Sequence, residues 1–498
     1  MTAPTWAERA KALAIDGRAL IDGQRVNALS GECFDVVSPI NGLAIGTAAR
    51  CGQADVDLAV AAARAAFDDG RWSMQPPAAR KKILQKFAEN ITRASDELAL
   101  LESLDVGKPI RWSQSVDVPA TARAIAWYAE AIDKIYDEIA PTGRNALALI
   151  TREPMGVVGC IVPWNYPMIM AAWKLGPALA AGNSVVLKPS EKSPLTAMRL
   201  AELALDAGLP SGVFNVVPGL GVEAGEALAL HMNVDALGFT GSTQTGRRML
   251  EYASRSNLKR VYNELGGKSA FLVFDDCDDV DRAAQAAASG MFFNSGQSCN
   301  APSRVLVQRK VYDQFIERAT AAASTYTPGD PLNPGTTMGS VVDRAQLQTI
   351  NRYIDLGKHH GAALLLGGRT TLQASGGFYV EPTIFATTDP TQQIAREEIF
   401  GPVMTVIPFT DEAEAIGIAN DSPYGLQAAV WTAHLDRAHR VARALRAGTV
   451  HVNQYEEDDI TVPFGGYKQS GNGRDKSLHA FDKYTELKTT WIRINSAP

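Results

Sequence analysis

The chain has 498 residues, more than one hydrophobic core usually supports, and about 150 residues per domain predicts roughly three domains. Apolar residues make up 46% and charged residues 20% of the sequence, as in water-soluble globular proteins. The net charge of −6 gives no reason to expect a nucleic-acid partner, so a small-molecule substrate fits better.

The cysteines indicate a reducing compartment. Five cysteines, at positions 33, 51, 160, 277 and 299, are odd in number and form no CxxC pair. This argues against a disulfide framework and a structural zinc site, and we expect no metal. Charges interrupt the first part of the chain, which therefore lacks the apolar core of a secretory signal. A cytoplasmic protein is predicted.

One uncharged stretch, Pro154 to Trp173, is long enough to span a bilayer. Prolines 154, 163 and 167 and Asn165 break it, so a buried strand, a loop and a helix start are predicted instead. We expect no membrane contact.

Amphipathic periodicity predicts helices early in the chain, and these cover Asp55 to Phe67, Ala78 to Leu104 and Pro119 to Ile139. From Val157 to Val307, short β-branched runs alternate with Gly or Pro turns and Ala/Leu-rich helical segments. The strand candidates begin at Val157, Ser184, Val213, Ala236, Lys259 and Ser269. This alternation predicts an α/β fold with a doubly wound, mostly parallel sheet, whose ligands bind at the carboxyl ends of strands.

A second α/β layer is predicted beyond Val307, because further helices alternate with β-rich pieces from Pro402 and Gly448. These helices cover Val311 to Ser324, Ala345 to His359, Asp411 to Ala419 and Asp436 to Ala447. The tail YTELKTTWIRI alternates polar and apolar residues, which is typical of a strand with one covered face. A terminal strand of this kind usually pairs, and a partner subunit is plausible.

Cys299 is the central candidate residue. It lies in FFNSGQSCNAPSR, where Gly296 and Gln297 favour a turn that presents the sulfur to substrate. A single cysteine is more often a small buried hydrophobe, so other residues must support the assignment as a nucleophile.

Two polar residues that follow predicted strands supply that support. Glu264 in NELGGK is a possible general base, although a surface-loop glutamate is the commoner outcome. Asn165 in VPWNYP could donate to an oxyanion, and a plain Asx turn before proline is the alternative.

The segment VVLKPSEKSP also follows a strand. Lys188 and Glu191 could hold the hydroxyls of a nucleotide ribose, and a solvated loop is equally plausible. Pro194 could open the next helix, with Ser193 as its cap.

A phosphate site is predicted in GFTGSTQTGRR, where Gly241, Ser242 and Gly246 lie at a strand-to-helix turn with free backbone N–H groups. The segment GLGVEA, which contains Gly221, nearly fits the dinucleotide fingerprint, but no acidic residue stands about twenty positions on. Alone, this second motif is weak.

Together these motifs resemble the aldehyde dehydrogenase superfamily over nearly the whole chain. The motifs are PWNY at 163, KPSEKSP at 188, FTGSTQTG at 239, ELGGKS at 264, GQSC at 296, EEIFGPV at 397 and PFGGYKQSGNGRD at 463. The C-terminal segment is most similar to bacterial γ-glutamyl-γ-aminobutyraldehyde and 4-guanidinobutyraldehyde dehydrogenases.

The resemblance implies a covalent mechanism. Cys299 attacks the aldehyde, the Asn165 side chain and the Cys299 backbone N–H hold the oxyanion, and Glu264 activates the water that hydrolyses the thioester. Lys188 is grouped with these catalytic residues. Because a free thiol has a pKa of about 8.5, we expect the site to lower the pKa of Cys299.

The resemblance also implies a dinucleotide cofactor. Lys188 and Glu191 bind the adenosine ribose, Ser242 meets the pyrophosphate, and Glu398 and Phe400 position the nicotinamide ribose. The other implied cofactor residues are Pro163, Trp164, Gly221, Gly241, Gly246, Leu265 and Gln346. A carboxylate facing the ribose repels a 2′-phosphate, so NAD is favoured over NADP. Asp475 replaces a more usual Glu and is expected to lie away from the chemistry.

The substrate is predicted to be an ω-amino or guanidino aldehyde. Tyr166, Met170 and Trp173 share one helical face and should line a tunnel, although this face could be ordinary core. Residues 456–459 are four successive carboxylates, from which Glu457 and Asp459 are expected to attract a cationic group at the tunnel mouth. A solvated loop is the alternative.

The family likeness predicts three parts of the chain. Residues 1–135 and 155–265 form the NAD-binding domain, 266–465 the catalytic domain, and 136–154 with 478–498 a small β oligomerisation arm. A homodimer or homotetramer is expected.

Four other functions fit parts of the sequence. A broad-specificity aliphatic aldehyde dehydrogenase shares every motif. A CoA-acylating relative generally lacks the glutamate at Glu264, and a non-catalytic relative would lose the nucleophile or base. A cysteine hydrolase needs a histidine partner, and none of the seven histidines lies in a recognisable partner motif.

Overall fold

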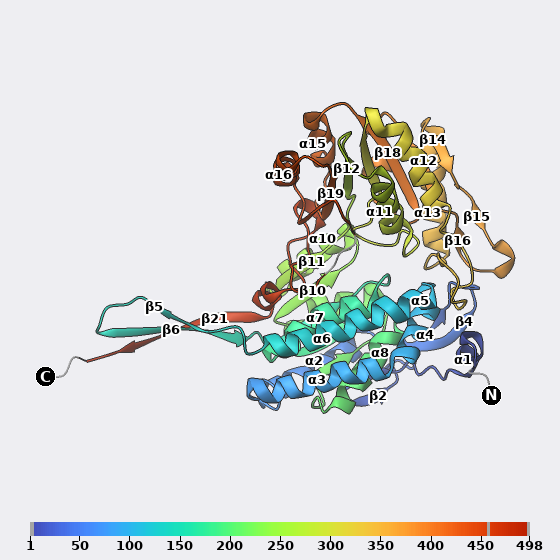
Figure 1. Ribbon diagram of the computed structural model, residues 1–498. Helices are drawn as coiled ribbons and strands as arrows, with labels where there is room; N and C mark the ends of the chain where they lie inside the picture. The colour runs from blue at the N-terminus through green and yellow to red at the C-terminus, as the bar shows by residue number, and fades with distance from the viewer. Residues whose placement is uncertain (1–3, 456–458, 496–498) are drawn as a thin grey trace.

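The computed structural model describes residues 4–455 and 459–495, and two large sheets dominate it (Figure 1). The first sheet has the order β11-β10-β7-β8-β9-β1-β2. These strands are β11 (Arg260–Glu264), β10 (Ala236–Thr240), β7 (Val157–Ile161), β8 (Ser184–Lys188), β9 (Phe214–Val216), β1 (Ala19–Ile21) and β2 (Gln24–Val26). The strands from β11 to β9 are parallel, as predicted, whereas the hairpin of β1 and β2 adds an antiparallel edge.

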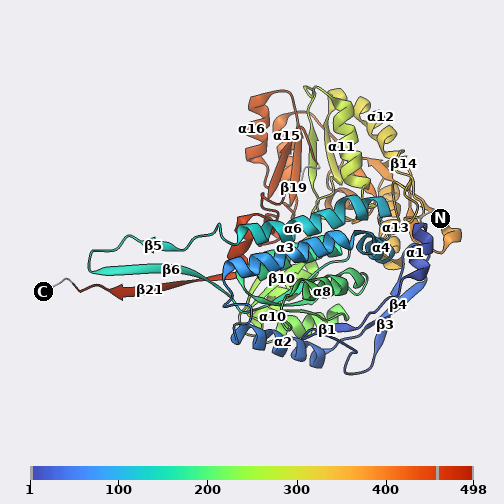
Figure 2. The ribbon, with the colours of Figure 1, turned by 60° about the horizontal axis from the view of Figure 1, so that its bottom comes forward.

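Helices cover both faces of this sheet, which confirms the doubly wound architecture. On one face α7 and α8 contact the strands, and α3, α4 and α6 pack over them, while α2, α9 and α10 lie with the core of the other face (Figure 2). Their bounds are α2 (Gln53–Asp68), α3 (Pro77–Arg93), α4 (Ser95–Val106), α6 (Val118–Ala131), α7 (Pro167–Ala181), α8 (Leu195–Ala207), α9 (Glu226–Leu230) and α10 (Thr243–Ser254). Within the described residues, no helix combines the length and apolar character needed to cross a membrane.

Three local predictions are wrong. The helix predicted over 78–104 is two helices, because Ala94 leaves the helical conformation between the end of α3 at Arg93 and the start of α4 at Ser95. The helix predicted to end at Ile139 ends at Ala131, and its last predicted residues belong to β5 (Glu138–Ala140), which pairs with β6 (Ala146–Pro154). Ser193 does not cap α8: its hydroxyl has no partner among the described residues, and the Leu195 N–H donates to Asp105 Oδ2 at 2.9 Å.

The second sheet has the order β14-β17-β18-β13-β12-β19-β20. Its strands are β14 (Ala363–Leu366), β17 (Thr383–Ala386), β18 (Val403–Phe409), β13 (Arg304–Gln308), β12 (Ala270–Val273), β19 (Gln427–Trp431) and β20 (Thr449–Val452). Only the β14–β17 pair is antiparallel among these described strands. The predicted repeat over 157–307 is therefore divided, since its last strands, β12 and β13, belong to this second sheet.

Helices also cover the second sheet on both faces. Apolar side chains of α11 and α12 form one core with alternate residues of the central strands, and those of α15 and α16 form another on the opposite face. The bounds are α11 (Val280–Phe292), α12 (Tyr312–Ala323), α13 (Arg344–His359), α15 (Glu412–Asn420) and α16 (Leu435–Ala444). Smaller elements are α1 (Trp6–Ala12), β3 (Cys33–Val37), β4 (Ala44–Ala49), α5 (Ile110–Trp112), β15 (Thr370–Thr371), β16 (Tyr379–Val380) and α14 (Gln393–Arg396).

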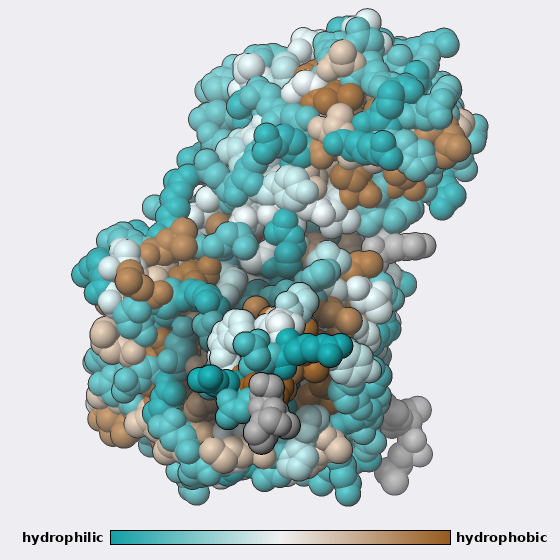
Figure 3. Space-filling view, turned by 90° about the vertical axis from the view of Figure 1, so that its left-hand side faces the viewer, coloured by the Kyte–Doolittle hydropathy of each residue, from teal (hydrophilic) through white to brown (hydrophobic). Residues whose placement is uncertain are grey.

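A three-stranded antiparallel arm projects from the body (Figure 1). Strand β21 (Thr485–Arg493) pairs with β6 (Ala146–Pro154) along its whole length. The predicted covered face is absent in the single chain, because Leu487 and Trp491 are 59% and 66% exposed. Figure 3 looks onto the side from which the arm projects, where apolar side chains lie among polar ones.

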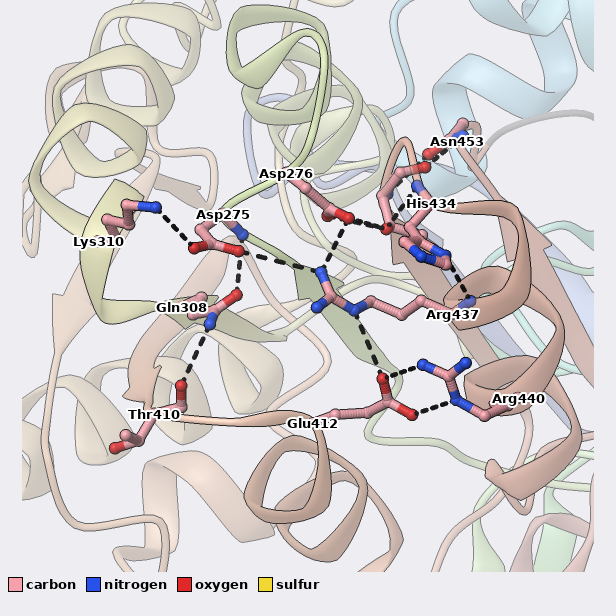
Figure 4. A network of polar contacts seen from close by, with 11 residues as sticks. Asp275, Asp276, Gln308, Lys310, Thr410, Glu412, His434, Arg437, Arg440 and Asn453 are labelled. Atoms are coloured by element: carbon pink, nitrogen blue, oxygen red, sulfur yellow. Dashed lines mark hydrogen bonds and ion pairs between the residues drawn. The ribbon is translucent and has the colours of Figure 1, made fainter.

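An ion-pair network closes the carboxyl edge of the second sheet (Figure 4). Arg437 of α16 lies between three carboxylates, with Nη1 2.9 Å from Asp276 and Nε 3.4 Å from Glu412, and its guanidinium stacks over Phe274 at 4.7 Å. Asp275 is the third carboxylate, at 3.9 Å. Ligands commonly bind at this edge of parallel sheets, but here the side chains of the fold fill it.

Replacing this partly buried arginine should destabilise the protein. We expect Arg437→Met to lower the free energy of unfolding by about 1–3 kcal/mol, because it leaves Asp275, Asp276 and Glu412 crowded without their shared cation. Thermal or urea unfolding, monitored by circular dichroism, measures the loss.

Arg440→Met is the matched control. Arg440 pairs with Glu412 at 2.9 Å but its side chain is 57% exposed, so water screens the pair and we expect a loss below about 1 kcal/mol. Equal losses for the two variants would contradict the central place of Arg437.

Candidate active site

The site lies between the two sheets. The carboxyl ends of β7, β8, β10 and β11 in the first sheet carry four of the predicted motifs, as expected. Cys299 instead precedes β13, so the amino edge of the second sheet faces those carboxyl ends. The nucleophile candidate and the cofactor candidates thus come from opposite edges of different sheets.

A tight turn holds Cys299. Ser295 and Gly296 both adopt left-handed conformations, with φ of 52° and 70°. A Cβ on Gly296 would lie 2.2 Å from the Gly401 carbonyl oxygen, so only glycine permits this close approach. The buried Gln297 side chain accepts from the Val342 N–H at 2.9 Å and anchors the turn.

Asn165 is attached directly to this turn. Its Nδ2 donates to the Gln297 carbonyl at 2.9 Å, and Asn294 Nδ2 donates back to the Asn165 carbonyl at 3.1 Å. An amide nitrogen carries two hydrogens, so one remains for a ligand beside Cys299.

Glu264 ends β11 and is 3% exposed, and neither carboxylate oxygen has a hydrogen-bond partner among the described residues. Burial, followed by the charges of Asp475 and Glu398, raises the pKa of Glu264 to about 8. The structure thus brings Glu264 and Cys299 together, since each shifts the pKa of the other.

The expected lowering of the Cys299 pKa is wrong for this state of the protein. Burial raises the pKa of the thiol well above its ordinary value, and the charges of Glu264 and Glu398 raise it further. Carboxylates, which disfavour a thiolate, dominate the electrostatic environment of the sulfur.

Asp475 lies closer to the chemistry than predicted, because its charge contributes to the raised pKa of Glu264. It is 2% exposed, lies 3.2 Å from Lys174 Nζ and forms a short ion pair with Lys483. Burial opposes ionisation of Asp475, but the two lysines outweigh it and lower its pKa. The motifs did not predict this cluster, and its sequence signal is the isolated charge of Lys174 in the otherwise apolar helix α7.

The predicted ribose residues form an ion pair. Lys188 ends β8, is 2% exposed, and donates from Nζ to Glu191 Oε2 at 3.0 Å. Burial alone would raise the pKa of Glu191, but the charge of Lys188, hydrogen bonds to the carboxylate and the charge of Lys192 together outweigh it, so the pKa is lowered. Glu191 is therefore a carboxylate at neutral pH.

The phosphate turn differs in part from the prediction. Ser242 is the N-cap of α10, and its Oγ accepts from the Thr245 N–H at 3.2 Å. The N–H of Gly241 donates to the Glu264 carbonyl and that of Gly246 to the Ser242 carbonyl, so neither is free for a phosphate. Gly246 is buried because its missing side chain leaves room for Leu265.

The remaining cofactor candidates divide into two groups. Glu398 Oε1 accepts from the Gly267 N–H at 2.8 Å, and Phe400 packs edge-on against Trp164, which follows Pro163 after β7. Gln346 donates to the Ile399 and Phe400 carbonyls, so it fixes their loop. Gly221 lies exposed at the start of a π-helical turn, Gly221–Gly225.

A cavity of about 390 Å³ opens beside the thiol. Tyr166, Met170 and Trp173 line it together with Cys299, and the Tyr166 hydroxyl lies 2.7 Å from Ser298 Oγ. The other described lining residues are Val116, Ala120, Ile169, Gly290, Phe293, Ser298, Asn300, Gln427, Thr449, His451, Tyr455, Val462, Pro463, Phe464 and Lys476. The volume suits a small-molecule substrate.

Only one of the two predicted acidic residues, Asp459, lies within the described part of the chain. Glu457 lies outside the described residues, as do its neighbours at 456 and 458. Asp459 is exposed, accepts from the Thr461 N–H at 2.8 Å, and is not among the described residues that line the cavity. A substrate contact at this run stays a prediction.

Comparison with known proteins identifies the family. The family model described as "Aldehyde dehydrogenase family" matches residues 26–490. The chain belongs to this family. It is therefore an NAD(P)-dependent aldehyde dehydrogenase.

Several relatives cover almost the whole chain. The NADP/NAD-dependent aldehyde dehydrogenase PuuC of Escherichia coli is 53% identical over 99% of this chain and 98% of that protein. A γ-glutamyl-γ-aminobutyraldehyde dehydrogenase from Burkholderia cenocepacia superposes with a TM-score of 0.97 at 57% identity, covering 98% and 99% of the two chains. An indole-3-acetaldehyde dehydrogenase with bound NAD+ gives 0.98 at 56%, covering 99% and 100%.

Proposed function

We propose that this aldehyde dehydrogenase oxidises an ω-amino or guanidino aldehyde to its carboxylic acid through a thioester on Cys299. The observation that carries the proposal is the position of Cys299 at the wall of the cavity, where the nearby Glu264 carboxylate acts on the pKa of the thiol. Cys299 is the nucleophile, and Glu264 accepts protons first from the thiol and later from water.

Asn165 and the backbone N–H of Cys299 stabilise the oxyanion. The hydrogen bond to the Gln297 carbonyl fixes the rotamer of Asn165, so the second amide hydrogen has a fixed direction before substrate binds. Loss of one such donor typically lowers the rate about 100- to 1000-fold.

The residues at the carboxyl edge fit a dinucleotide. When bound, NAD accepts the hydride. Lys188 and Glu191 hold ribose hydroxyls, the N-terminus of α10 at Ser242 binds phosphate, and Glu398 with Phe400 orients the second ribose. Lys188 thus serves cofactor binding; no described contact connects it with Cys299.

NAD is favoured over NADP because Glu191 stays ionised beside the ribose site and repels a 2′-phosphate. The Lys188 charge offsets part of this repulsion, since its Nζ is 3.0 Å from Glu191. We therefore expect a preference for NAD that does not exclude NADP. The E. coli relative is an NADP/NAD-dependent enzyme.

Two competing chemistries fit the site less well. A CoA-acylating enzyme does not need Glu264, which is buried here next to the thiol. A cysteine hydrolase needs an imidazolium that lowers the thiol pKa; His451 lines the cavity, but the charges that act on Cys299 are carboxylates, which raise it.

The arm supports a homo-oligomer. Strand β21 exposes Leu487 and Trp491 on one face and Ile492 on the other in the single chain, and a second copy would cover such apolar side chains. We propose a dimer or tetramer with domains at 1–135 plus 155–265 and at 266–465, and an arm at 136–154 plus 478–498. The odd, unpaired cysteines support a cytoplasmic location.

The test is NADH formation, followed by absorbance, with amino, guanidino and unsubstituted aliphatic aldehydes of matched length. We expect turnover with NAD without CoA and the largest kcat/KM for aldehydes with a cationic group. Equal kcat/KM values for all three classes would favour a broad-specificity enzyme, and a strict need for CoA would overturn the hydrolytic step.

A further inference from the structure

A small cavity at the amino edge of the second sheet gathers two buried basic side chains and a hydroxyl. Lys268, Ser269 and Arg304 line this cavity, called here the Lys268 cavity, and its volume is about 20 Å³. The three residues are 2%, 3% and 2% exposed. Lys268 Nζ, Ser269 Oγ and Arg304 Nε have no hydrogen-bond partner among the described residues. Three unpaired donors are therefore gathered around one confined space.

The lining supplies positive charge only. Among the described residues that line the Lys268 cavity, Arg446 is a third basic residue, and none is an aspartate or a glutamate. Burial, followed by the like charge of Arg304, lowers the pKa of Lys268 to about 7. Two like charges that are buried side by side destabilise the fold unless a charge of opposite sign accompanies them.

The nearest carboxylates do not fill this role. The charges of Glu398 and Glu397 oppose the lowering of the Lys268 pKa. However, Glu397 accepts from the Tyr353 hydroxyl at 2.6 Å, and Glu398 accepts from the Gly267 N–H at 2.8 Å. Within the described part of the chain, neither forms an ion pair with Lys268.

The Arg304 guanidinium is fixed in place. Its Nη1 donates to the Ile418 carbonyl at 3.0 Å and its Nη2 to the Ala419 carbonyl at 2.8 Å. Burial, followed by the charge of Arg396, lowers the pKa of Arg304 to about 10, so the group is still a cation at neutral pH. The unpaired Nε therefore keeps both its position and its need for an acceptor.

The volume of the Lys268 cavity limits the acceptor to a very small one. A cavity needs about 10–15 Å³ to hold one particle of the size of water, so about 20 Å³ has no room for phosphate, sulfate or a carboxylate. Ammonium and guanidinium groups can only donate, whereas a halide ion only accepts. One halide can thus satisfy all three donors and supply the missing negative charge.

We propose that the Lys268 cavity binds a monatomic anion, chloride under ordinary conditions, through Lys268 Nζ, Arg304 Nε and Ser269 Oγ. The site is separate from the cavity beside Cys299, since among the described lining residues only Gln427 is common to both. Binding requires neither aldehyde nor NAD. The anion links the segment before β12 to the start of β13, and it should therefore stabilise the second sheet.

The first test locates the anion in crystals of the whole protein. Bromide can take the place of chloride and is recognised by its anomalous scattering. Crystals grown with sodium bromide should show an anomalous peak between Lys268 Nζ and Arg304 Nε. Crystals of Lys268→Met should lose about nine-tenths of this peak or more, because methionine has a similar length but neither the charge nor the donor.

The second test measures binding in solution through the midpoint of thermal unfolding. An anion that binds only the folded protein raises this midpoint. When chloride replaces gluconate, which is too large for the cavity, at constant ionic strength, the midpoint should rise by about 1–2 °C more in the wild type than in Lys268→Met. General salt effects act on both proteins and cancel in this comparison.

Two further variants complete the comparison. Lys82→Met, at an exposed position of α3, makes the same change in net charge and should respond to chloride as the wild type does. Ser269→Ala removes only the uncharged donor, so its response should lie between those of the wild type and Lys268→Met.

Three results would overturn the proposal. These are a water molecule in place of the bromide peak in wild-type crystals, an undiminished peak and midpoint shift in folded Lys268→Met, and a bromide peak without any chloride-specific stabilisation, which would mark an adventitious ion only. Should Lys268→Met fail to fold, the wild-type peak and the response of Ser269→Ala decide instead. NADH formation with aldehydes tests the proposed function separately, because it does not depend on this site.

Discussion

Replacing Cys299 with alanine is expected to abolish aldehyde oxidation, with a loss in kcat of about 10⁴-fold or more. The reason is covalent: no other described cavity-lining residue is a cysteine, and the neighbouring Ser298 hydroxyl is held by Tyr166. NADH formation at saturating aldehyde measures the loss, and mass spectrometry of acid-quenched wild type should detect the acylated residue.

Cys33→Ser is the matched control, because Cys33 is exposed on β3 and distant in sequence from every motif. It should retain wild-type turnover. Alanine at 299 should leave thermal unfolding almost unchanged, since the thiol faces a cavity. Residual activity above about one per cent in Cys299→Ala would contradict a covalent mechanism at this residue.

Motifs selected residues that the fold brings near one another, whereas periodicity misplaced several helix ends. Glu264 and Lys188 are the last residues of strands in the first sheet and Asn165 lies shortly after a third strand, and parallel strands end at the same edge. Cys299 could not be placed by that rule, since it lies before β13 in the other sheet. Only the family likeness connected it with Glu264.

Residues with long-range partners were missed. Lys174 and Asp475 are 301 positions apart and meet through Nζ and Oδ2 at 3.2 Å, a contact that no local pattern encodes. Lys476, which lines the cavity beside Cys299, and Ser477 are both left-handed without being glycine, against the usual preference. The pKa of Cys299 was mispredicted for a related reason, because burial and two carboxylates act on it together.

Asymmetry in the two sheet edges explains the architecture of the site. The carboxyl edge of the first sheet carries Lys188 and Glu264, whereas that of the second is closed by the Arg437 network (Figure 4). The cavity-lining residues contributed by the second sheet lie at its amino edge instead. These are Cys299, Gln427 and Thr449.

Glu264→Gln should separate the two halves of the reaction. Glutamine keeps the volume but cannot accept a proton, so thioester hydrolysis should slow about 100- to 10,000-fold. If acylation finds another proton acceptor such as bulk hydroxide, rapid mixing at alkaline pH should show a burst of NADH near one equivalent per site, followed by a very slow phase. Fast steady-state turnover by the variant would exclude Glu264 as the base.

The pH dependence gives an independent check on the same carboxylate. The pKa of Glu264 is raised to about 8, so its ionised fraction should rise about tenfold per pH unit below 8 and level off above it. The rate of thioester hydrolysis by the wild-type enzyme should follow this fraction. The Gln variant should lack this rise.

Stability has the opposite trend: burial favours the protonated form, so the free energy of unfolding should fall as pH increases from about 4.5 to about 8. Glutamine should remove that part of the decline, and a wild-type and a variant curve that stay parallel across this window would show that Glu264 titrates near its ordinary pKa.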